Sequence, residues 1–444
     1  MLKEIKIYLF SIGILLLTGC TQNEMSNLQN PISVSNSDDE TLSNSNESAG
    51  NFDRALSTPV SLSGTTYYVC VSASSCGSSE WATGVDSTAS LQGKSKKKPF
   101  KSIDYAENQA KPGDLIIVGS GIYKSLSTEY KYAILYLKKS GASGKPISIK
   151  SEKKWGAILD ATGIDQAVML NCQYSTAYIR IDGFEIRNAR YVGVNSKDLN
   201  AAPWTSCSNI ELTNMKIHHF GRVGIALENA KNSLIASNLI YATTTDTSTH
   251  NHYHGIYISD LTNDILMKNN IIYGIKAGWP IHIYDGHGKG PANNHKVINN
   301  TLINDNPYRG GGIVMYGIGH VIRNNLIYNR TRILADYPSA ISENTNISST
   351  GTIIQNNMTN MKVLCMKGCR GASSITGNIL NITTLATDFV SLSGLNFQLK
   401  SIAKAVNKGT MTGFGTRSGA PTDDFLNKKR VIGSSVDIGA HENY

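Results

Sequence analysis

Residues 265–273 read ILMKNNIIY, and this order of a β-branched run, Asn and a second apolar run recurs through the central half of the chain. VIRNNLIY at 321–328 repeats it in full, and IIQNN at 353–357 and VINN at 297–300 repeat its first part. The Asn positions are separated by roughly 21–32 residues, the period of one coil of a solenoid. A single coil cannot bury its apolar side chains alone, so the coils are expected to stack about 4.8 Å apart.

The composition supports an all-β, turn-rich protein. Of the 444 residues, 40% are hydrophobic and 17% are charged, against about 25% charged in a typical soluble domain. The 40 Gly and 21 Tyr, together with abundant Asn and Thr, argue against a helical bundle because these residues form helices poorly. The net charge of +9 suits an acidic partner. Since no nucleic-acid-binding motif is present, we expect that partner to be an acidic polysaccharide.

The repeats resemble the right-handed parallel β-helix repeat family over roughly residues 65–390. The resemblance implies an all-β, single-stranded right-handed parallel β-helix, whereas the signature of its rival, the leucine-rich repeat, is absent. KPFKSI at 98–103 and GIYK at 121–124 are similar to the opening of many secreted β-helix proteins. In those proteins a short helix, here about 103–109, caps the first coil. Residues 424–442, which end in VDIGAHE, resemble the C-terminal capping segment of such proteins.

The N-terminus indicates a lipoprotein. Lys3 and Lys6 precede an apolar run at 7–17 that is too short to span a bilayer, and Leu17-Thr18-Gly19-Cys20 matches the bacterial lipobox. We therefore predict a signal peptide at 1–19, lipidation of Cys20 and a Ser/Asn-rich flexible linker at 20–62. The β-helix is predicted at 63–390 and the capping segment at 391–444. This organisation predicts a monomer in the cell envelope, held at the outer membrane or cell surface only by its lipid.

Six cysteines remain after Cys20, and an envelope location permits disulfides. Their spacing is compatible with the pairs Cys70–Cys76, Cys172–Cys207 and Cys365–Cys369. We expect at least one disulfide, although spacing alone leaves the connectivity open. No Cys/His cluster has the spacing of a zinc site.

Side-chain alternation places a column of aromatic residues on the outside of the β-helix. In GIYIS at 255–259 and PIHIY at 280–284 the isoleucines face inward, so Tyr257 and His282 face outward. Ser259 and Tyr284 follow about 7 Å further along their strands. Neighbouring coils are expected to add Ala226, Glu228, Val314 and Tyr316. Repeated exposed aromatic residues predict a platform for sugar rings.

Parallel β-helix polysaccharide lyases, which split uronate chains by β-elimination, are the first enzyme class that the resemblance suggests. Their reaction needs a base, an acid for the leaving oxygen and a cation for the uronate carboxylate. We predict His282 as the base and Tyr257 or Tyr284 as the acid. The predicted substrate contacts are His252, His254, Arg309, Tyr316, Lys276 and Lys289.

Three other functions remain open. Gly286-His287-Gly288 is similar to an element of polygalacturonases, but the Asn-Thr-Asp and Asp-Asp motifs of those glycoside hydrolases are missing. A uronate C5-epimerase would share the proton abstraction, and a non-catalytic surface glycan-binding or adhesion lipoprotein would use the same aromatic face.

Carboxylates near the column are few, which weakens the case for two-carboxylate hydrolysis. They are Glu228, Asp260 and Asp285, and the two aspartates are predicted to form turns. We assign no metal ligands: a bound calcium ion could neutralise the uronate carboxylate, but the sequence offers no convincing acidic cluster to hold it.

Overall fold

The computed structural model describes most of the chain from Gly64 to Tyr444. The described residues are 64–127, 130–196, 206–243, 253–286, 288–304, 311–329, 339–343, 349–382, 387–392, 394, 396–410, 422–430 and 433–444. The predicted signal peptide, the lipidated Cys20, the linker, His252 and Arg309 lie outside these ranges. Within them, no helix has both the length and the apolar character needed to cross a membrane.

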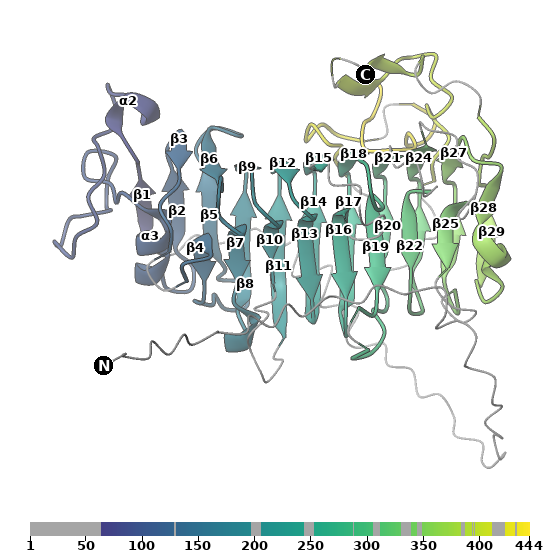
Figure 1. The fold of residues 1–444 in the computed structure, drawn as a ribbon. Coiled ribbons are helices and arrows are strands. Elements are labelled where there is room, and N and C mark those ends of the chain that lie inside the picture. The colour runs from purple at the N-terminus through teal and green to yellow at the C-terminus, as the bar shows by residue number, and fades with distance from the viewer. Residues whose placement is uncertain are drawn as a thin grey trace, which may run out of the picture. The chain divides into compact units, whose positions relative to one another are not determined.

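Three parallel sheets form the β-helix, and consecutive strands pass from one sheet to the next (Figure 1). In the described residues, sheet I holds β1 (Thr66–Val69), β2 (Leu115–Val118), β5 (Ile147–Ser151), β8 (Ala177–Asp182), β11 (Cys207–Thr213), β14 (Ala230–Ala236), β17 (Asn263–Lys268), β20 (Lys296–Ile298), β23 (Val321–Arg323), β26 (Ile353–Gln355) and β29 (Ser374–Thr376). Sheet II holds β4 (Ala133–Leu137), β7 (Gln166–Leu170), β10 (Val192–Asn195), β13 (Val223–Glu228), β16 (His254–Ser259), β19 (Ile281–Tyr284), β22 (Ile313–Met315), β25 (Ser339–Glu343) and β28 (Val363–Cys365). Sheet III holds β3 (Gly121–Tyr123), β6 (Ala157–Asp160), β9 (Glu185–Arg187), β12 (Lys216–Phe220), β15 (Leu239–Thr243), β18 (Ile271–Ile275), β21 (Thr301–Asn304), β24 (Leu326–Asn329) and β27 (Met358–Thr359).

The core is a set of inward columns with one side chain per coil. In sheet II, Ile225 pairs with Ile256 and Ile256 with Ile281, and all three are fully buried. The column two residues further along contains Leu227, Ile258, Ile283 and Met315, which are also fully buried. The predicted inward positions are therefore confirmed, and the period of two fixes which side chains face outward.

An Asn ladder joins the coils at the turns between sheets I and III. The Nδ2 group of Asn270 donates to Asn300 Oδ1 at 3.0 Å and to the backbone oxygen of Ile235 at 2.9 Å. Asn269, which precedes it, has a φ of 56°, a left-handed conformation that Asn tolerates. The first Asn of each Asn-Asn pair thus makes the turn and the second satisfies buried backbone groups. The ladder residues are Asn238, Asn270, Asn300, Asn325, Asn357 and Asn378.

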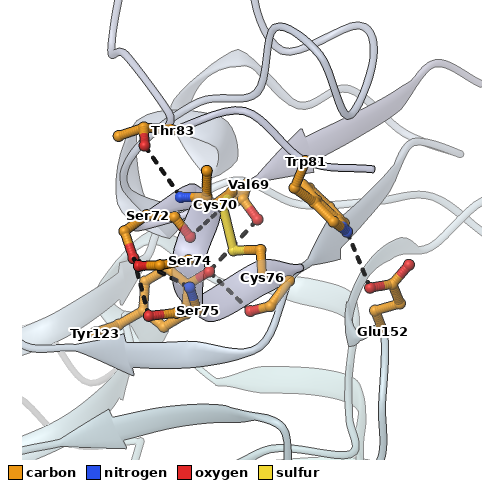
Figure 2. Close-up of a disulfide and its surroundings, with 12 residues drawn as sticks. Val69, Cys70, Ser72, Ser74, Ser75, Cys76, Trp81, Thr83, Tyr123 and Glu152 are labelled. Atoms are coloured by element: carbon orange, nitrogen blue, oxygen red, sulfur yellow. Dashed lines mark hydrogen bonds between the residues drawn. A yellow bond between two sulfur atoms is a disulfide. The ribbon is translucent and has the colours of Figure 1, made fainter. Parts of the chain in front are cut away.

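The N-terminal end is closed as the family resemblance implied. Helix α3 (Ile103–Gln109) matches the predicted range, and the Ser102 hydroxyl caps it by accepting from the Tyr105 N–H. A second short helix, α2 (Ala73–Cys76), is closed by the Cys70–Cys76 disulfide. Figure 2 shows this bond beside Trp81, whose Nε1 donates to Glu152 at 3.2 Å.

All three cysteine pairs that the spacing allowed are disulfides in the structure: Cys70–Cys76, Cys172–Cys207 and Cys365–Cys369. Cys172 begins the 3₁₀-helix η2 (Cys172–Tyr174), and Cys207 begins β11, so this bond ties two successive coils. The third pair links the end of β28 to the 3₁₀-helix η3 (Met366–Cys369).

The segment after β29 lies along the outer face of sheet III (Figure 1). It contains an antiparallel pair, β30 (Phe389–Ser391) and β31 (Asn396–Leu399), and the Phe397 ring lies 4.9 Å from that of Tyr273. The VDIGAHE motif is held by the fully buried Arg430, which pairs with Glu442 at 3.2 Å. The segment expected to cap the β-helix therefore packs against its side, which leaves the outer face of sheet II to other groups.

Candidate active site

Strands β16 and β19 place the predicted catalytic residues on adjacent coils of sheet II. Tyr257 pairs with His282, and Ser259 pairs with Tyr284, as the alternation predicted. Ala226 and Val314 flank the first pair. Tyr316 follows β22, and its ring centre lies 6.1 Å from that of Tyr284.

The column is less exposed than an open sugar platform would be. His282 is 9% exposed and His254 3%, whereas Tyr257, Tyr284 and Tyr316 are half-buried. His282 therefore keeps its predicted outward position in the column but is more buried than a residue of an open platform. Buried histidines often have a structural role, so the hydrogen bonds of their ring nitrogens decide what these two residues can do.

The hydrogen bonds of the two histidines fix where their protons lie. His254 Nδ1 accepts from the Trp279 backbone N–H at 3.2 Å, and its Nε2 lies 2.9 Å from His282 Nδ1. A neutral imidazole that accepts at one nitrogen carries its proton on the other, so His254 donates from Nε2 to His282 Nδ1. A neutral His282 then carries its own proton on Nε2. In this tautomer the accepting nitrogen of His282 faces His254, so the assignment of His282 as a base stays a prediction that requires the other tautomer or the other ring nitrogen.

Aromatic packing holds this pair rigidly. The His254 ring stacks on Tyr257 with centres 5.5 Å apart and on Trp279 with centres 5.8 Å apart. The His282 ring lies 5.1 Å from Tyr284. Trp279 was not among the predicted site residues, although its place directly before the strand, in Gly-Trp-Pro, was a usable signal.

Tyr257 is set up as a proton donor. Burial raises the pKa of its hydroxyl strongly, and the carboxylates of Glu228 and Asp260 raise it further. A phenol in these surroundings keeps its proton at physiological pH. Its predicted role as an acid is compatible with a phenol that holds its proton.

Asp260 and Asp285 come together because each directly follows its strand in adjacent coils. Asp260 has a φ of 48° and is fully buried, and Asp285 Oδ1 accepts from the Gly290 N–H at 3.2 Å, so both residues shape turns as predicted from sequence. Burial raises the pKa of Asp285, and a hydrogen bond and charge repulsion from Asp260 add to the increase. Asp260 therefore also acts on the protonation of Asp285, an effect that the interpretation as turns did not include.

Gly286 allows these groups to approach one another. A Cβ atom at this position would overlap the Tyr257 hydroxyl oxygen and would lie 3.7 Å from Asp260 Oδ2. The Tyr257 hydroxyl and the Asp260 carboxylate thus both lie against Gly286, and Asp285 directly precedes this glycine. Only glycine fits between them without displacing Tyr257.

The two predicted lysines lie at opposite edges of sheet II. Lys276 follows β18, before the chain enters sheet II, and Lys289 follows Asp285, after it leaves. Both are exposed. Neither lies within the sheet itself, so the buried floor of the site is made of histidine, tyrosine and carboxyl groups.

The residues described fit a calcium ion poorly. In proteins a calcium ion is bound by roughly six to eight oxygen ligands. The pair of Asp260 and Asp285 offers only two carboxylates. Among the described residues, one group of three has metal-binding atoms within 4.8 Å of one another, namely Glu343, Cys365 and Cys369. Both of its cysteines are in a disulfide, so we derive no catalytic step through a metal.

Comparison with known proteins supports the architecture. A family model described as right-handed beta helix region matches residues 163–317, which include β16 and β19. No curated protein sequence matches the chain. The fold and this match define the chain as a right-handed parallel β-helix protein.

Solved structures of similar fold include the pectate lyase Pel9A, with 16% identity, a TM-score of 0.50 and coverage of 86% of this chain and 97% of that one. A rhamnogalacturonan lyase shares 16% identity, with a TM-score of 0.45 and coverage of 74% and 92%. A lacto-N-biosidase from Eubacterium ramulus shares 12% identity, with a TM-score of 0.36 and coverage of 75% and 69%. At these identities the likeness concerns the fold.

Proposed function

We propose that this protein is a polysaccharide lyase that cleaves an acidic, uronate-containing glycan by β-elimination. The observation that carries the proposal is the meeting of a protonated Tyr257 with the Asp260–Asp285 pair beside Gly286. A protonated phenol and a carboxylate thus lie against the same glycine where β19 leaves sheet II. The same fold in a pectate lyase and the net charge of +9 support an anionic glycan as substrate.

The reaction needs a base for the proton next to the uronate carboxylate and a donor for the leaving oxygen. Asp285 is the better base of the carboxyl pair, because it is more exposed than Asp260 and its raised pKa makes its ionised form a stronger acceptor. Tyr257 donates its proton to the leaving oxygen. His282, with its proton on Nε2, donates a hydrogen bond to the uronate carboxylate and stabilises the charge that develops there.

Hydrolysis by two carboxylates is less well supported. Retaining enzymes need a separation of about 5–5.5 Å between the carboxyl groups and inverting enzymes about 6.5–9.5 Å. The carboxyl group of Asp260 raises the pKa of Asp285, so the protonation of one acts on that of the other. The pair therefore suits one proton-transfer role instead of two separate ones.

The test is the ultraviolet absorbance of the C4–C5 double bond that β-elimination creates. The purified protein is incubated with a panel of uronate polysaccharides, with and without EDTA. We expect absorbance to rise on at least one polymer, to survive EDTA, and to fall at least about 100-fold in Tyr257→Phe and Asp285→Asn. Tyr174→Phe, at an exposed tyrosine on η2, serves as the control.

A negative result is equally informative. New reducing ends without absorbance would replace the lyase by a hydrolase, and binding without any change in chain length would leave a glycan-binding protein. Altered uronate configuration without cleavage would indicate an epimerase. A complete loss of activity in EDTA would show that a divalent metal, absent from the proposed scheme, is required.

We also propose that Cys20 carries a lipid that holds the protein in the bacterial envelope. The pairing of Cys70–Cys76, Cys172–Cys207 and Cys365–Cys369 supports an oxidising compartment. Metabolic labelling with a radioactive fatty acid tests this anchor. Label should enter the wild type and be absent from Cys20→Ser, and an equally labelled variant would refute the assignment.

A further inference from the structure

A row of residues runs along the entry edge of sheet II and ends at the candidate active site. Its members directly precede β4, β7, β10 and β13, and we call them the entry-edge row: Tyr132, Asp165, Tyr191 and Arg222. Backbone hydrogen bonds connect successive coils here. The Tyr191 N–H donates to Asp165 at 2.9 Å, the Arg222 N–H to Tyr191 at 2.7 Å and the His254 N–H to Arg222 at 2.8 Å. Arg222 is thus one coil from His254, or about 4.8 Å along the sheet.

The side chains of this row, together with the neighbouring Arg190, combine aromatic faces with positive charge. The guanidinium carbon of Arg190 lies 5.3 Å from the centre of the Tyr191 ring, and that of Arg222 lies 5.0 Å from it. Such cation–π contacts hold the guanidinium groups in defined places near the ring. Tyr191 nevertheless remains 36% exposed. Tyr132, which lies two coils away toward the N-terminal end of the β-helix, is 44% exposed.

The two arginines differ in their partners. Arg190 Nη1 lies 3.5 Å from Asp165 Oδ1, an exposed ion pair of the kind that contributes little to stability. Among the described residues, Arg222 has no ion pair and no side-chain hydrogen bond, and its side chain is exposed. Its planar set of donors is therefore available for a carboxylate, which guanidinium groups bind in bidentate fashion.

We propose that Tyr191, Arg190 and Arg222 form a uronate-binding subsite that holds the acidic glycan beside the catalytic groups. The pyranose ring of a bound uronate lies on the exposed part of Tyr191, and its carboxylate accepts hydrogen bonds from Arg222. Tyr132 offers a further aromatic surface to the next part of the chain. The location of the subsite relative to cleavage rests on the proposed function, whereas the recognition of uronate does not.

This arrangement also explains how a site with several carboxyl groups can bind an anionic polymer. Glu228, Asp260 and Asp285 would repel a uronate at the buried floor of the site. The positive charge needed for binding lies instead one or two coils away, at Arg222 and Arg190. The predicted contacts Lys276 and Lys289 lie on the turns. Arg222 and Arg190 are therefore cationic groups that the sequence had not identified.

The experiment measures binding separately from cleavage. Affinity electrophoresis of the whole protein is run in gels that contain a uronate polymer or the same polymer after its carboxyl groups have been reduced to neutral alcohols. The variants are Arg222→Gln, Arg222→Lys and Tyr191→Ala. Lys231→Gln is the matched control, because it removes the same charge from an exposed position on β14 in sheet I.

We expect Arg222→Gln to lower affinity for the uronate polymer roughly tenfold, as for the loss of a charge-assisted hydrogen bond. Affinity for the neutral polymer should not change in this variant. Arg222→Lys should recover only part of the affinity because an ammonium group lacks the planar pair of donors. Tyr191→Ala should weaken binding to both polymers, and Lys231→Gln should stay within twofold of wild type. Thermal melts check that every variant is folded.

Equal affinities of Arg222→Gln and Lys231→Gln would overturn the subsite, as would a wild-type protein that does not bind the uronate polymer. The result is distinguishable from a failure of the proposed function. Arginine-dependent binding without an unsaturated product would retain the subsite and reject the lyase. Cleavage with unchanged KM in Arg222→Gln would retain the lyase and reject the subsite.

Discussion

Gly286→Ala is the substitution that tests the candidate active site most directly. The added Cβ would overlap the Tyr257 hydroxyl oxygen and lie 3.5 Å from its Cζ atom, so the phenol has to move. The ring has little freedom, since it stacks on His254 at 5.5 Å and lies 5.4 Å from His282. Overpacking of this kind costs about 1–3 kcal/mol of stability. A displacement of about 1 Å in a catalytic group lowers turnover about 100-fold.

A double-mutant cycle with Tyr257→Phe identifies the cause of the effect. Phenylalanine lacks the overlapping oxygen, and its Cζ at 3.5 Å from the new methyl group is in ordinary contact. Gly286→Ala should therefore cost about 1–3 kcal/mol in the wild type and close to zero in the Tyr257→Phe background, as measured by denaturant unfolding. The kcat of Gly286→Ala on the uronate polymer should fall about 100-fold. Equal losses of stability in both backgrounds, or an unchanged kcat, would refute the geometry described for Tyr257 and Asp260.

Three further predictions concern the scaffold. Burial raises the pKa of Glu107 to about 7, so the folded state holds this proton while the unfolded chain releases it near 4.5. The unfolding free energy should therefore fall by up to about 3 kcal/mol as the pH rises from 4.5 to 7. Denaturant titrations of Glu107→Gln should show no such dependence on pH. Replacement of both Cys172 and Cys207 by alanine should cost about 4 kcal/mol, because their bond closes a loop of 35 residues; an unchanged unfolding midpoint would contradict this. Asn300→Ala removes a buried side chain that accepts from Asn270 and donates to Asn325 and Met267, and it should cost at least about 3 kcal/mol by chemical denaturation. Asn378→Ala removes a more exposed side chain that accepts from Asn357 and donates to Ile354, and it should cost about 1 kcal/mol; similar losses would contradict the ladder.

The β-helix was predictable because its two controlling features are local in the sequence. The period of two in GIYIS at 255–259 and PIHIY at 280–284 determined the inward and outward faces, and the structure has that register. The Asn-Asn pairs marked the turns between sheets I and III. The position of the C-terminal segment was not accessible in this way, since its contact with Tyr273 depends on Phe397, far away in the chain.

The candidate site was predictable in its location and only partly in its chemistry. The column of Tyr257, His282 and Tyr284 follows from alternation, but the proton positions in His254 and His282 depend on the Trp279 N–H. That bond joins two coils at their entry edge, and no local pattern encodes it. The base role predicted for His282 therefore stays a prediction, because residue type alone does not say which ring nitrogen is occupied.

The repeat itself accounts for the carboxyl pair. Asp260 and Asp285 each stand immediately after a strand of sheet II, and a turn position filled by the same residue in consecutive coils brings like groups within about 4.8 Å of each other. A ladder of Asn at such a position is satisfied by hydrogen bonds, whereas a pair of Asp is satisfied only when it shares or exchanges a proton. The same stacking that stabilises the Asn ladder therefore raises the pKa of a carboxyl group when the repeated residue is Asp. A solenoid can in this way acquire a reactive pair by one substitution in each of two neighbouring turns, with no change in its core.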